Sequence, residues 1–182
     1  HFDHVGDADG TQTTALFGPK LRIHRIGESQ DHDELILAFP ENDQLMFWGE
    51  VTDDDRYLIV SITEGTENRN RLWAYPIIAG ERSSLGSPIK IIDEAIAEFA
   101  LAGSRGATLY LRTDLEAEAG RLIAVDLDDF ADSGQLRWQE LVAENDHTLY
   151  DAQAAGDGFI LVYLADALPL IVDPPISASP VP

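Results

Sequence analysis

Short apolar segments recur along the chain, and turns rich in glycine and acidic residues separate them. The segments are enriched in β-branched and aromatic residues, a composition typical of β-strands. The longer ones are continuous apolar runs rather than alternating ones, which indicates strands that are covered on both faces. The expected strands are residues 21–25, 35–38, 57–62, 71–75, 89–92, 108–113, 121–127, 140–143, 159–164 and 170–172.

These segments repeat with a step of about 51 residues. Residues 57–62 recur as 108–113 and 159–164, and residues 89–92 recur as 140–143. Several short strands per unit at this period are typical of a β-propeller blade, a small antiparallel sheet that packs face to face on its neighbours. Residues 93–102 have apolar positions at helical spacing, but the repeat predicts the first strand of a blade there. A β-sandwich is the alternative architecture.

We therefore expect an all-β partial β-propeller of about three to four four-stranded blades at residues 1–173. It comprises an incomplete blade at about residues 1–40, blades at about 45–93 and 96–143, and an incomplete blade at about 147–173; residues 174–182 are expected to be a proline-rich tail. Only about 3.6 repeats fit the chain, whereas propellers usually close with four to eight blades. Open blade edges favour self-association, most simply as a dimer.

Charge and composition exclude several classes of function. The chain has 182 residues, of which 45% are apolar, as in globular proteins, and its 33 acidic and 12 basic residues leave a net charge of −21. Such a field repels phosphate backbones and anionic lipids, so we expect neither nucleic-acid nor membrane partners. The absence of cysteine excludes disulfides, thiolate metal sites and cysteine nucleophiles. With no long apolar run and no signal-peptide pattern, we expect a soluble, cytoplasmic protein.

Several motifs occur in a recognisable order along most of the chain. They are DGT at 9–11, KLRIHRIGESQDHDELIL at 20–37, VTDDDRYLIVSITEGT at 51–66, NRLWAY at 70–75, KIIDE at 90–94, GRLIAVDL at 120–127, LVAE at 141–144 and VYLAD at 162–166. In this order the sequence resembles the N-terminal propeller domain of the prolyl oligopeptidase family of serine peptidases. It departs from the family pattern at Asp55, where glycine is usual, in residues 113–120, which lack the usual proline, and beyond Asp166.

The resemblance implies part of a seven-bladed propeller that caps an α/β-hydrolase domain. In such proteins that domain carries a Ser–Asp–His triad and cleaves short peptides after proline, and the propeller admits only small or unfolded peptides. The expected partners are therefore a hydrolase domain in an intact parent protein and, through it, short peptides. Two alternatives stay open: the propeller of an oligopeptidase B-like peptidase, which prefers basic residues, and a stand-alone binding or assembly module without enzymatic activity.

The chain itself is expected to lack catalytic residues. An α/β-hydrolase nucleophile needs a Gly-x-Ser-x-Gly-like turn, and the nearest sequences, Gly86-Ser87-Pro88 and Gly103-Ser104-Arg105, lack the second glycine and are interpreted as turns between blades. Histidine could supply a base, and the chain contains His1, His4, His24, His32 and His147. His24 falls within an expected strand, where a structural role is favoured. We predict no turnover of a proline-containing peptide by this chain.

No metal or cofactor is predicted, and the substrate-binding residues are unassigned. Three short patterns resemble metal sites without completing one: His1 and His4 with Asp3; Asp7-x-Asp9-Gly10, which has Val5 and Leu16 at the outer ligand positions of a calcium loop; and Asp126 with Asp128 and Asp129. No pair of acidic residues stands out as a glycosidase pair, and no phosphate-binding glycine loop is present. Most large aromatic residues are expected in the core: Trp48, Trp73, Tyr75, Tyr110, Trp138 and Tyr163.

Overall fold

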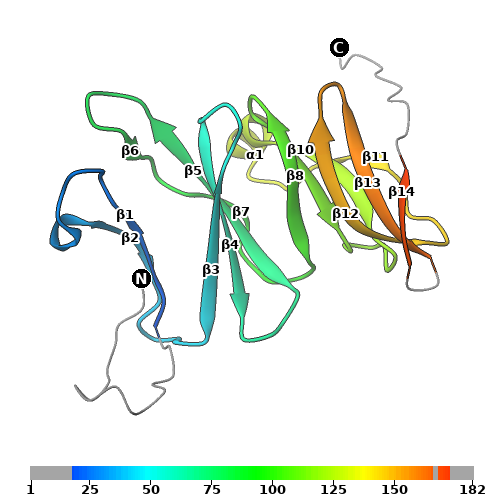
Figure 1. Cartoon of the computed structure of the whole chain (residues 1–182), viewed down its shortest axis with the longest axis horizontal. Coiled ribbons are helices and arrows are strands. Elements are labelled where there is room, and N and C mark those ends of the chain that lie inside the picture. Colours follow the sequence, from blue (N-terminus) through cyan, green and yellow to red (C-terminus); the bar gives the residue numbers. More distant parts are fainter. Residues whose placement is uncertain (1–17, 166–167, 173–182) are drawn as a thin grey trace. The chain divides into compact units, whose positions relative to one another are not determined.

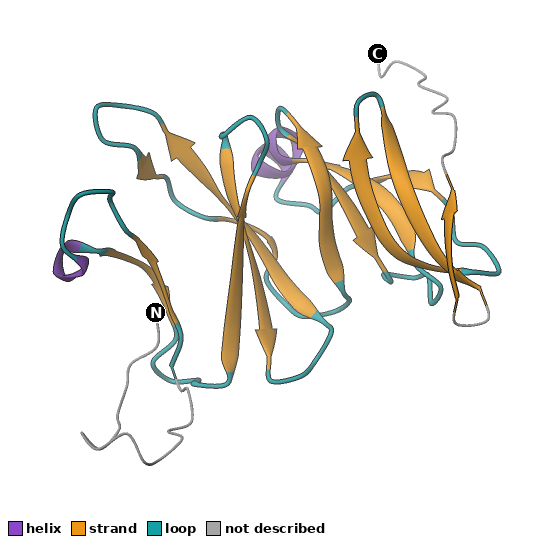
Figure 2. Ribbon diagram, in the orientation of Figure 1, coloured by secondary structure: helices purple, strands orange, loops and turns teal. Residues whose placement is uncertain are grey.

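The computed structural model describes residues 18–165 and 168–172 as a set of antiparallel β-sheets (Figures 1 and 2). The chain divides into two compact units, one comprising His1–Trp48 with Ile62–Glu67 and the other Gly49–Ser61 with Asn68–Pro182. Within the described residues, no helix is long and apolar enough to cross a membrane. The fold is all-β, as the sequence predicts.

The first unit contains an antiparallel pair of strands, β1 (Lys20–Ile23) and β2 (Glu34–Ala38), joined through a short 3-10 helix, η1 (Gln30–His32). The predicted strand at 21–25 is too long, because β1 ends at Ile23 and the chain turns through Gly27, whose φ is +88°. His24 therefore lies in the connection rather than in a strand. Its Nδ1 is 2.7 Å from Asp33 Oδ1, a bond that holds the two ends of this connection together.

A first sheet has the strand order β3-β4-β5-β6, and β7 pairs with another part of β5. Leu72 of β5 lies opposite Ile92 of β7, whereas Ile77 near the end of β5 lies opposite Leu85 of β6. The strands are β3 (Leu45–Val51), β4 (Tyr57–Glu64), β5 (Asn70–Ile78), β6 (Ser84–Leu85) and β7 (Ile89–Ile92). The expected strands at 57–62, 71–75 and 89–92 are thus confirmed, whereas β3 and β6 had no counterpart among the predicted strands.

The next two sheets repeat this arrangement along the chain. The second sheet has the order β11-β10-β9-β8 and the third the order β12-β13-β14. Their strands are β8 (Phe99–Arg105), β9 (Thr108–Thr113), β10 (Arg121–Asp126), β11 (Gln139–Val142), β12 (Thr148–Ala155), β13 (Gly158–Ala165) and β14 (Leu168–Val172). The structure confirms a strand at the end of residues 93–102, where helical spacing favoured a helix.

The predicted strand at 121–127 is wrong at its end, because Leu127 begins a helix, α1 (Leu127–Ser133). The reason is local. The Asp126 carboxylate accepts hydrogen bonds from the backbone N–H groups of Asp128 and Asp129, both at 2.9 Å, and so satisfies donors that a helix N-terminus leaves free. Gly134, in the left-handed conformation with φ +64°, ends the helix.

Two hydrophobic clusters hold the three sheets together. One, between the first and second sheets, contains Leu72 and Phe99; the other, between the second and third, contains Leu149 and Leu161. Strand β10 contributes to both, because successive side chains of a strand point to opposite faces: Leu122 belongs to the second cluster and Ile123 to the first, and both are fully buried. Coverage on both faces explains why these strands are continuous apolar runs.

The aromatic residues follow the prediction only in part. Trp73, Tyr75 and Tyr163 are buried, as expected. Trp48 is not: its side chain, on the edge strand β3 of the first sheet, is 55% exposed. Trp138 precedes β11 and is half-buried against the Arg121 guanidinium, 5.2 Å from its ring centre.

Candidate functional site

A pocket of about 300 Å³ opens beside strands of all three sheets in the second unit. Its charged lining residues are carboxylates only: Glu50 of β3, Asp53 of the turn between β3 and β4, and Asp151 of β12. The remaining lining residues are Leu101, Ala102 and Gly103 of β8, and Ala152, Gln153 and Ala154 of β12. The lining offers no serine, histidine or cation, so its own chemistry is limited to attracting positive charge and accepting hydrogen bonds.

Gly103 sets how closely β8 and β12 approach one another at this pocket. A Cβ on Gly103 would lie 2.5 Å from the Cβ of Ala154, far inside van der Waals contact. The backbone of Gly103 also has φ +142°, in a region that side chains disfavour, and the pairing of β8 with β9 shifts register beside it. Glycine is therefore required here by both contact and conformation.

Turn residues at the other side of the pocket are held by short hydrogen bonds. The Thr52 hydroxyl donates to Asp54 Oδ1 at 2.9 Å, and the Asp55 N–H donates to the Thr52 carbonyl at 2.9 Å. Asp55 has φ +56°. Aspartate tolerates this left-handed conformation better than most residues, so the turn forms although Asp55 replaces the glycine expected from the family pattern.

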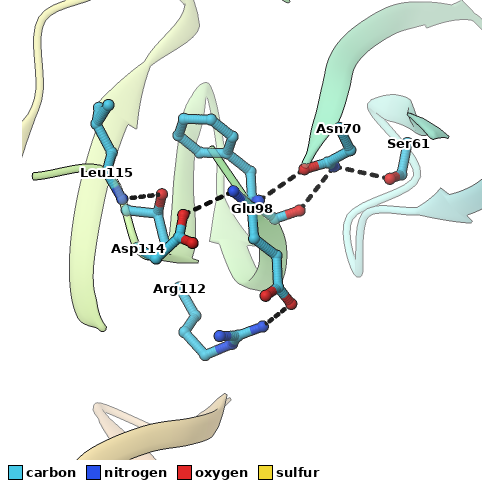
Figure 3. A network of polar contacts seen from close by, with 8 residues as sticks. Ser61, Asn70, Glu98, Arg112, Asp114 and Leu115 are labelled. Atoms are coloured by element: carbon cyan, nitrogen blue, oxygen red, sulfur yellow. Dashed lines mark hydrogen bonds and ion pairs between the residues drawn. The ribbon is translucent and has the colours of Figure 1, made fainter. Parts of the chain in front are cut away.

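The most developed polar network in the described part of the chain centres on Asn70, which is 2% exposed (Figure 3). Its Oδ1 accepts the Phe99 N–H at 2.7 Å, and its Nδ2 donates to the Phe99 carbonyl at 2.9 Å and to Ser61 Oγ at 2.8 Å. Because Phe99 begins β8, this one side chain joins the first sheet to the backbone of the second. We call these bonds of Asn70 to Phe99 and Ser61 the asparagine clasp.

The loop around Glu98 extends this network (Figure 3). The Glu98 N–H donates to Asp114 Oδ1 at 2.7 Å, and the Glu98 carboxylate forms an ion pair with Arg112 of β9. The Thr113 hydroxyl, in a fully buried residue, accepts the Leu115 N–H at 3.1 Å. Each of these groups is paired with another group of the protein, and the bonds of Asp114 and Thr113 hold backbone N–H groups, as expected of a structural network.

The structure places neither candidate serine in the predicted setting. Gly86-Ser87-Pro88 connects β6 and β7 of one sheet, and Gly103-Ser104-Arg105 lies within β8, so neither is a turn between blades. The register shift beside Gly103 bends β8 without ending it, which explains why residues 103–105 were wrongly predicted to form a turn.

Burial raises the pKa of the Tyr75 phenol above its usual value near 10.0.

The candidate histidines and metal ligands do not converge in the described residues. His24 contacts Asp33, and His32 and His147 are exposed. Asp126 with Asp128 and Asp129 forms the helix cap described above. Residues 1–17 lie outside the described residues, and with them His1, Asp3, His4, Val5, Asp7, Asp9, Gly10 and Leu16. In the part of the chain that the structure describes, no group of three or more His, Asp or Glu side chains is arranged to hold a metal ion.

Sequence reasoning missed both the clasp and the pocket. Asn70 precedes an apolar run, and asparagine at such a position usually indicates a turn. The three pocket carboxylates are far apart in the sequence, since about 100 residues separate Glu50 from Asp151. The only sequence signal for the pocket is the repeat itself, which brings the first strands of successive sheets side by side.

Comparison with known proteins agrees with this architecture. Residues 6–175 match the family described as the prolyl oligopeptidase N-terminal β-propeller domain. Prolyl oligopeptidase A of Galerina marginata is 34% identical over 144 residues, which cover 77% of this chain and 18% of that protein. Prolyl endopeptidase of Elizabethkingia meningoseptica is 28% identical over 157 residues, covering 82% of this chain and 20% of that protein.

Solved structures give the same fold. Prolyl oligopeptidase B from Galerina marginata, bound to a 25mer macrocyclization substrate, superposes with a TM-score of 0.81 over 97% of this chain and 25% of that one, at 19% sequence identity. A prolyl endopeptidase superposes with a TM-score of 0.76 over 86% of this chain. The chain thus spans about a fifth of the length of the curated relatives. By its match over residues 6–175, it belongs to the prolyl oligopeptidase N-terminal β-propeller family.

Proposed function

We propose that this chain acts as the access-controlling propeller of a prolyl oligopeptidase-like serine peptidase. The observation that carries the proposal is the family match over residues 6–175. The face-packed antiparallel sheets of the described residues support it. The groups that break the peptide bond then belong to a hydrolase domain covalently joined to the propeller, and the substrates are short proline-containing peptides.

The physical contribution of such a propeller is selection and exclusion. A ring of rigid sheets above an active site admits an extended peptide but not a folded protein, because the folded chain is wider than the passage. The same enclosure removes bulk water from the reaction, which strengthens electrostatic interactions with the transition state. Sheet junctions held by buried hydrogen bonds, such as those of Asn70 with Phe99, supply the rigidity that this selection needs.

The proposal is tested first by the sequence encoded directly downstream of residue 182. Further blade repeats, followed in frame by a segment with a Gly-x-Ser-x-Gly turn and then the aspartate and histidine of a triad, support the proposal. A downstream segment of unrelated type contradicts it.

Activity measurements give the second test. We expect the 182-residue chain alone not to hydrolyse a chromogenic proline-containing peptide. A protein that carries this chain together with the hydrolase domain is expected to cleave that peptide, and not the same peptide sequence placed in a loop of a folded carrier protein. Turnover by the isolated chain that a serine-directed reagent abolishes contradicts the assignment of a non-catalytic role.

A further inference from the structure

The two junctions between successive sheets differ in the polar contacts that bridge them. Asn70 is the first residue of β5 in the first sheet, and Arg121, 51 residues later, is the first residue of β10 in the second. Both residues begin the third of the long strands in their sheet. Their side chains point to different sides, however: Asn70 shares the face of Leu72 and reaches the sheet that follows, whereas Arg121 shares the face of Ile123, which packs toward the first sheet.

At the first junction, Asn70 does reach the following sheet. Its carboxamide binds both the N–H and the carbonyl of Phe99, and its own N–H donates to the Ala97 carbonyl at 3.1 Å. Phe99 is 3% exposed. Separating these sheets breaks all of these buried bonds before water can replace them, and each buried group left without a partner is costly.

The guanidinium of Arg121 binds within its own sheet and does not bridge the second junction. Nη1 is 3.2 Å from Glu140 Oε2 of β11, and Nη2 donates to the Glu116 carbonyl. Tyr150, the residue 51 positions after Phe99, lies at a register shift in β12 and is 61% exposed. The residue that faces the third sheet two positions before Leu122 is Gly120, where a Cβ would lie 3.1 Å from the Leu149 carbonyl oxygen, and glycine has no side chain with which to form a clasp.

In the described part of the chain, the polar contacts across the second junction are fewer and more exposed. The Leu149 N–H donates to the Ala119 carbonyl at 2.7 Å, and Arg105 Nη2 donates to the Gly156 carbonyl at 3.3 Å from an exposed position. The same junction forms two walls of the acidic pocket, since Ala102 and Gly103 of β8 face Ala152 and Ala154 of β12 there.

We propose that the second junction opens in the folded protein more readily than the first, and that the third sheet moves as a separate unit. Among the described residues, opening the second junction breaks the Leu149–Ala119 backbone bond and the exposed Arg105–Gly156 bond, whereas opening the first breaks the asparagine clasp. This opening separates the β8 and β12 walls of the acidic pocket. Local openings of this kind have free energies below that of global unfolding. The proposal does not depend on the peptidase assignment.

The absence of native cysteine permits a direct test by thiol labelling. Leu122→Cys and Ile123→Cys form a matched pair: the two side chains are isomers, adjacent on β10 and fully buried, but Leu122 faces the third sheet and Ile123 the first. Local unfolding of β10 exposes both equally, so only the opening of a junction distinguishes them. With a neutral thiol reagent under native conditions, we expect Leu122→Cys to react about tenfold faster.

A second substitution tests whether the asparagine clasp is the reason that the first junction opens less readily. Adding Asn70→Ala to each cysteine variant is expected to speed labelling at position 123 about tenfold and to leave labelling at position 122 within a factor of about two. Equal labelling of the two single-cysteine variants, or faster labelling of Ile123→Cys, overturns the proposal.

Amide exchange in the unmodified chain gives a measurement that no substitution can disturb. The Phe99 and Leu149 N–H groups each donate across one junction, to Asn70 Oδ1 and to the Ala119 carbonyl respectively. We expect the Leu149 amide to exchange about tenfold faster than the Phe99 amide after correction for intrinsic rates. Equal protection of these two amides means that the three sheets open as one unit, which contradicts the proposal.

Discussion

Asn70 holds two sheets together with a single polar side chain, because its carboxamide matches the hydrogen-bonding groups of the Phe99 backbone. Replacing it by alanine leaves a buried N–H and a buried carbonyl without partners. We expect Asn70→Ala to lower the free energy of unfolding by about 3 kcal/mol, measured by urea denaturation. Asn68→Ala, two residues earlier at an exposed position, is the control and is expected to change it by less than about 0.5 kcal/mol. Equal effects of the two substitutions would show that the asparagine clasp does not contribute to the free energy of unfolding.

Gly103 is required by the approach of β8 to β12. Gly103→Ala places a methyl group 2.5 Å from the Ala154 Cβ and adds backbone strain, so we expect a loss of about 2–4 kcal/mol in unfolding free energy. Ala154→Gly in the same chain removes the clash but not the strain, and should recover about half of the loss. Gly80→Ala is the control, since its Cβ would meet only ordinary contacts and its φ is not positive. A Gly103→Ala variant as stable as Gly80→Ala would refute this explanation.

Tyr75 gives the fold a sensitivity to alkaline pH. Burial raises the pKa of its phenol in the folded state above the value near 10.0 of the unfolded chain. The resulting stabilisation is fully present below about pH 10 and is lost as the pH rises through the folded-state pKa. We expect the midpoint of urea unfolding to fall less between about pH 9 and pH 11 in Tyr75→Phe than in the unmodified protein. Tyr150→Phe, at an exposed position, is the control, and an equal fall in all three proteins would disprove the assignment.

Among the elements, β10 and α1 show how local chemistry ends a strand. Residues 121–127 are a continuous apolar run closed by an aspartate and a leucine, and this pattern predicts one strand. The strand ends at Asp126 because its carboxylate caps the helix that follows. The sequence did contain a helix-start signal, an aspartate followed by acidic residues in the first turn. The preceding apolar run nevertheless favoured the prediction of a single strand.

The cap makes a testable contribution to this element. Asp126→Ala removes the acceptor of two backbone N–H groups, so we expect the protein to lose about 1 kcal/mol of stability in thermal or urea unfolding. Asp132→Ala, at an exposed position later in the same helix, removes the same charge without removing the cap. If both variants lose the same amount, charge rather than capping explains the effect.

The whole molecule carries a net charge of −21, and its described ion pairs engage only a minority of its 33 carboxylates. Mutual repulsion of these groups opposes the compact state and is screened by salt. We expect the melting temperature to rise by about 5 °C or more between low salt and about 0.5 M NaCl. The rise should shrink in a variant with Glu81→Gln, Glu94→Gln, Asp132→Asn and Asp157→Asn, all at exposed positions. An unchanged rise in that variant would contradict the electrostatic cause.

The extent of successful prediction differs between the strands and the candidate site. Strands with one continuous apolar run, such as β4 and β9, were found because burial on both faces leaves a strong local pattern. Strand β12 was missed as an individual element because Asp151 and Gln153 interrupt its apolar positions. The pocket and the asparagine clasp were also missed, since each joins residues that are distant in the chain.

The sequence by itself determined the strand-rich fold, the 51-residue repeat and the kinship with peptidase propellers, because these depend on the order of apolar and turn residues along the chain. Tertiary structure alone decided which side chains meet between the sheets. Asn70 and Arg121 each begin a strand and lie 51 residues apart, yet Asn70 faces and binds the following sheet, whereas Arg121 lies on the opposite face of β10 and binds its own sheet. That choice depends on the side chains each one meets in three dimensions, which no local pattern of sequence records.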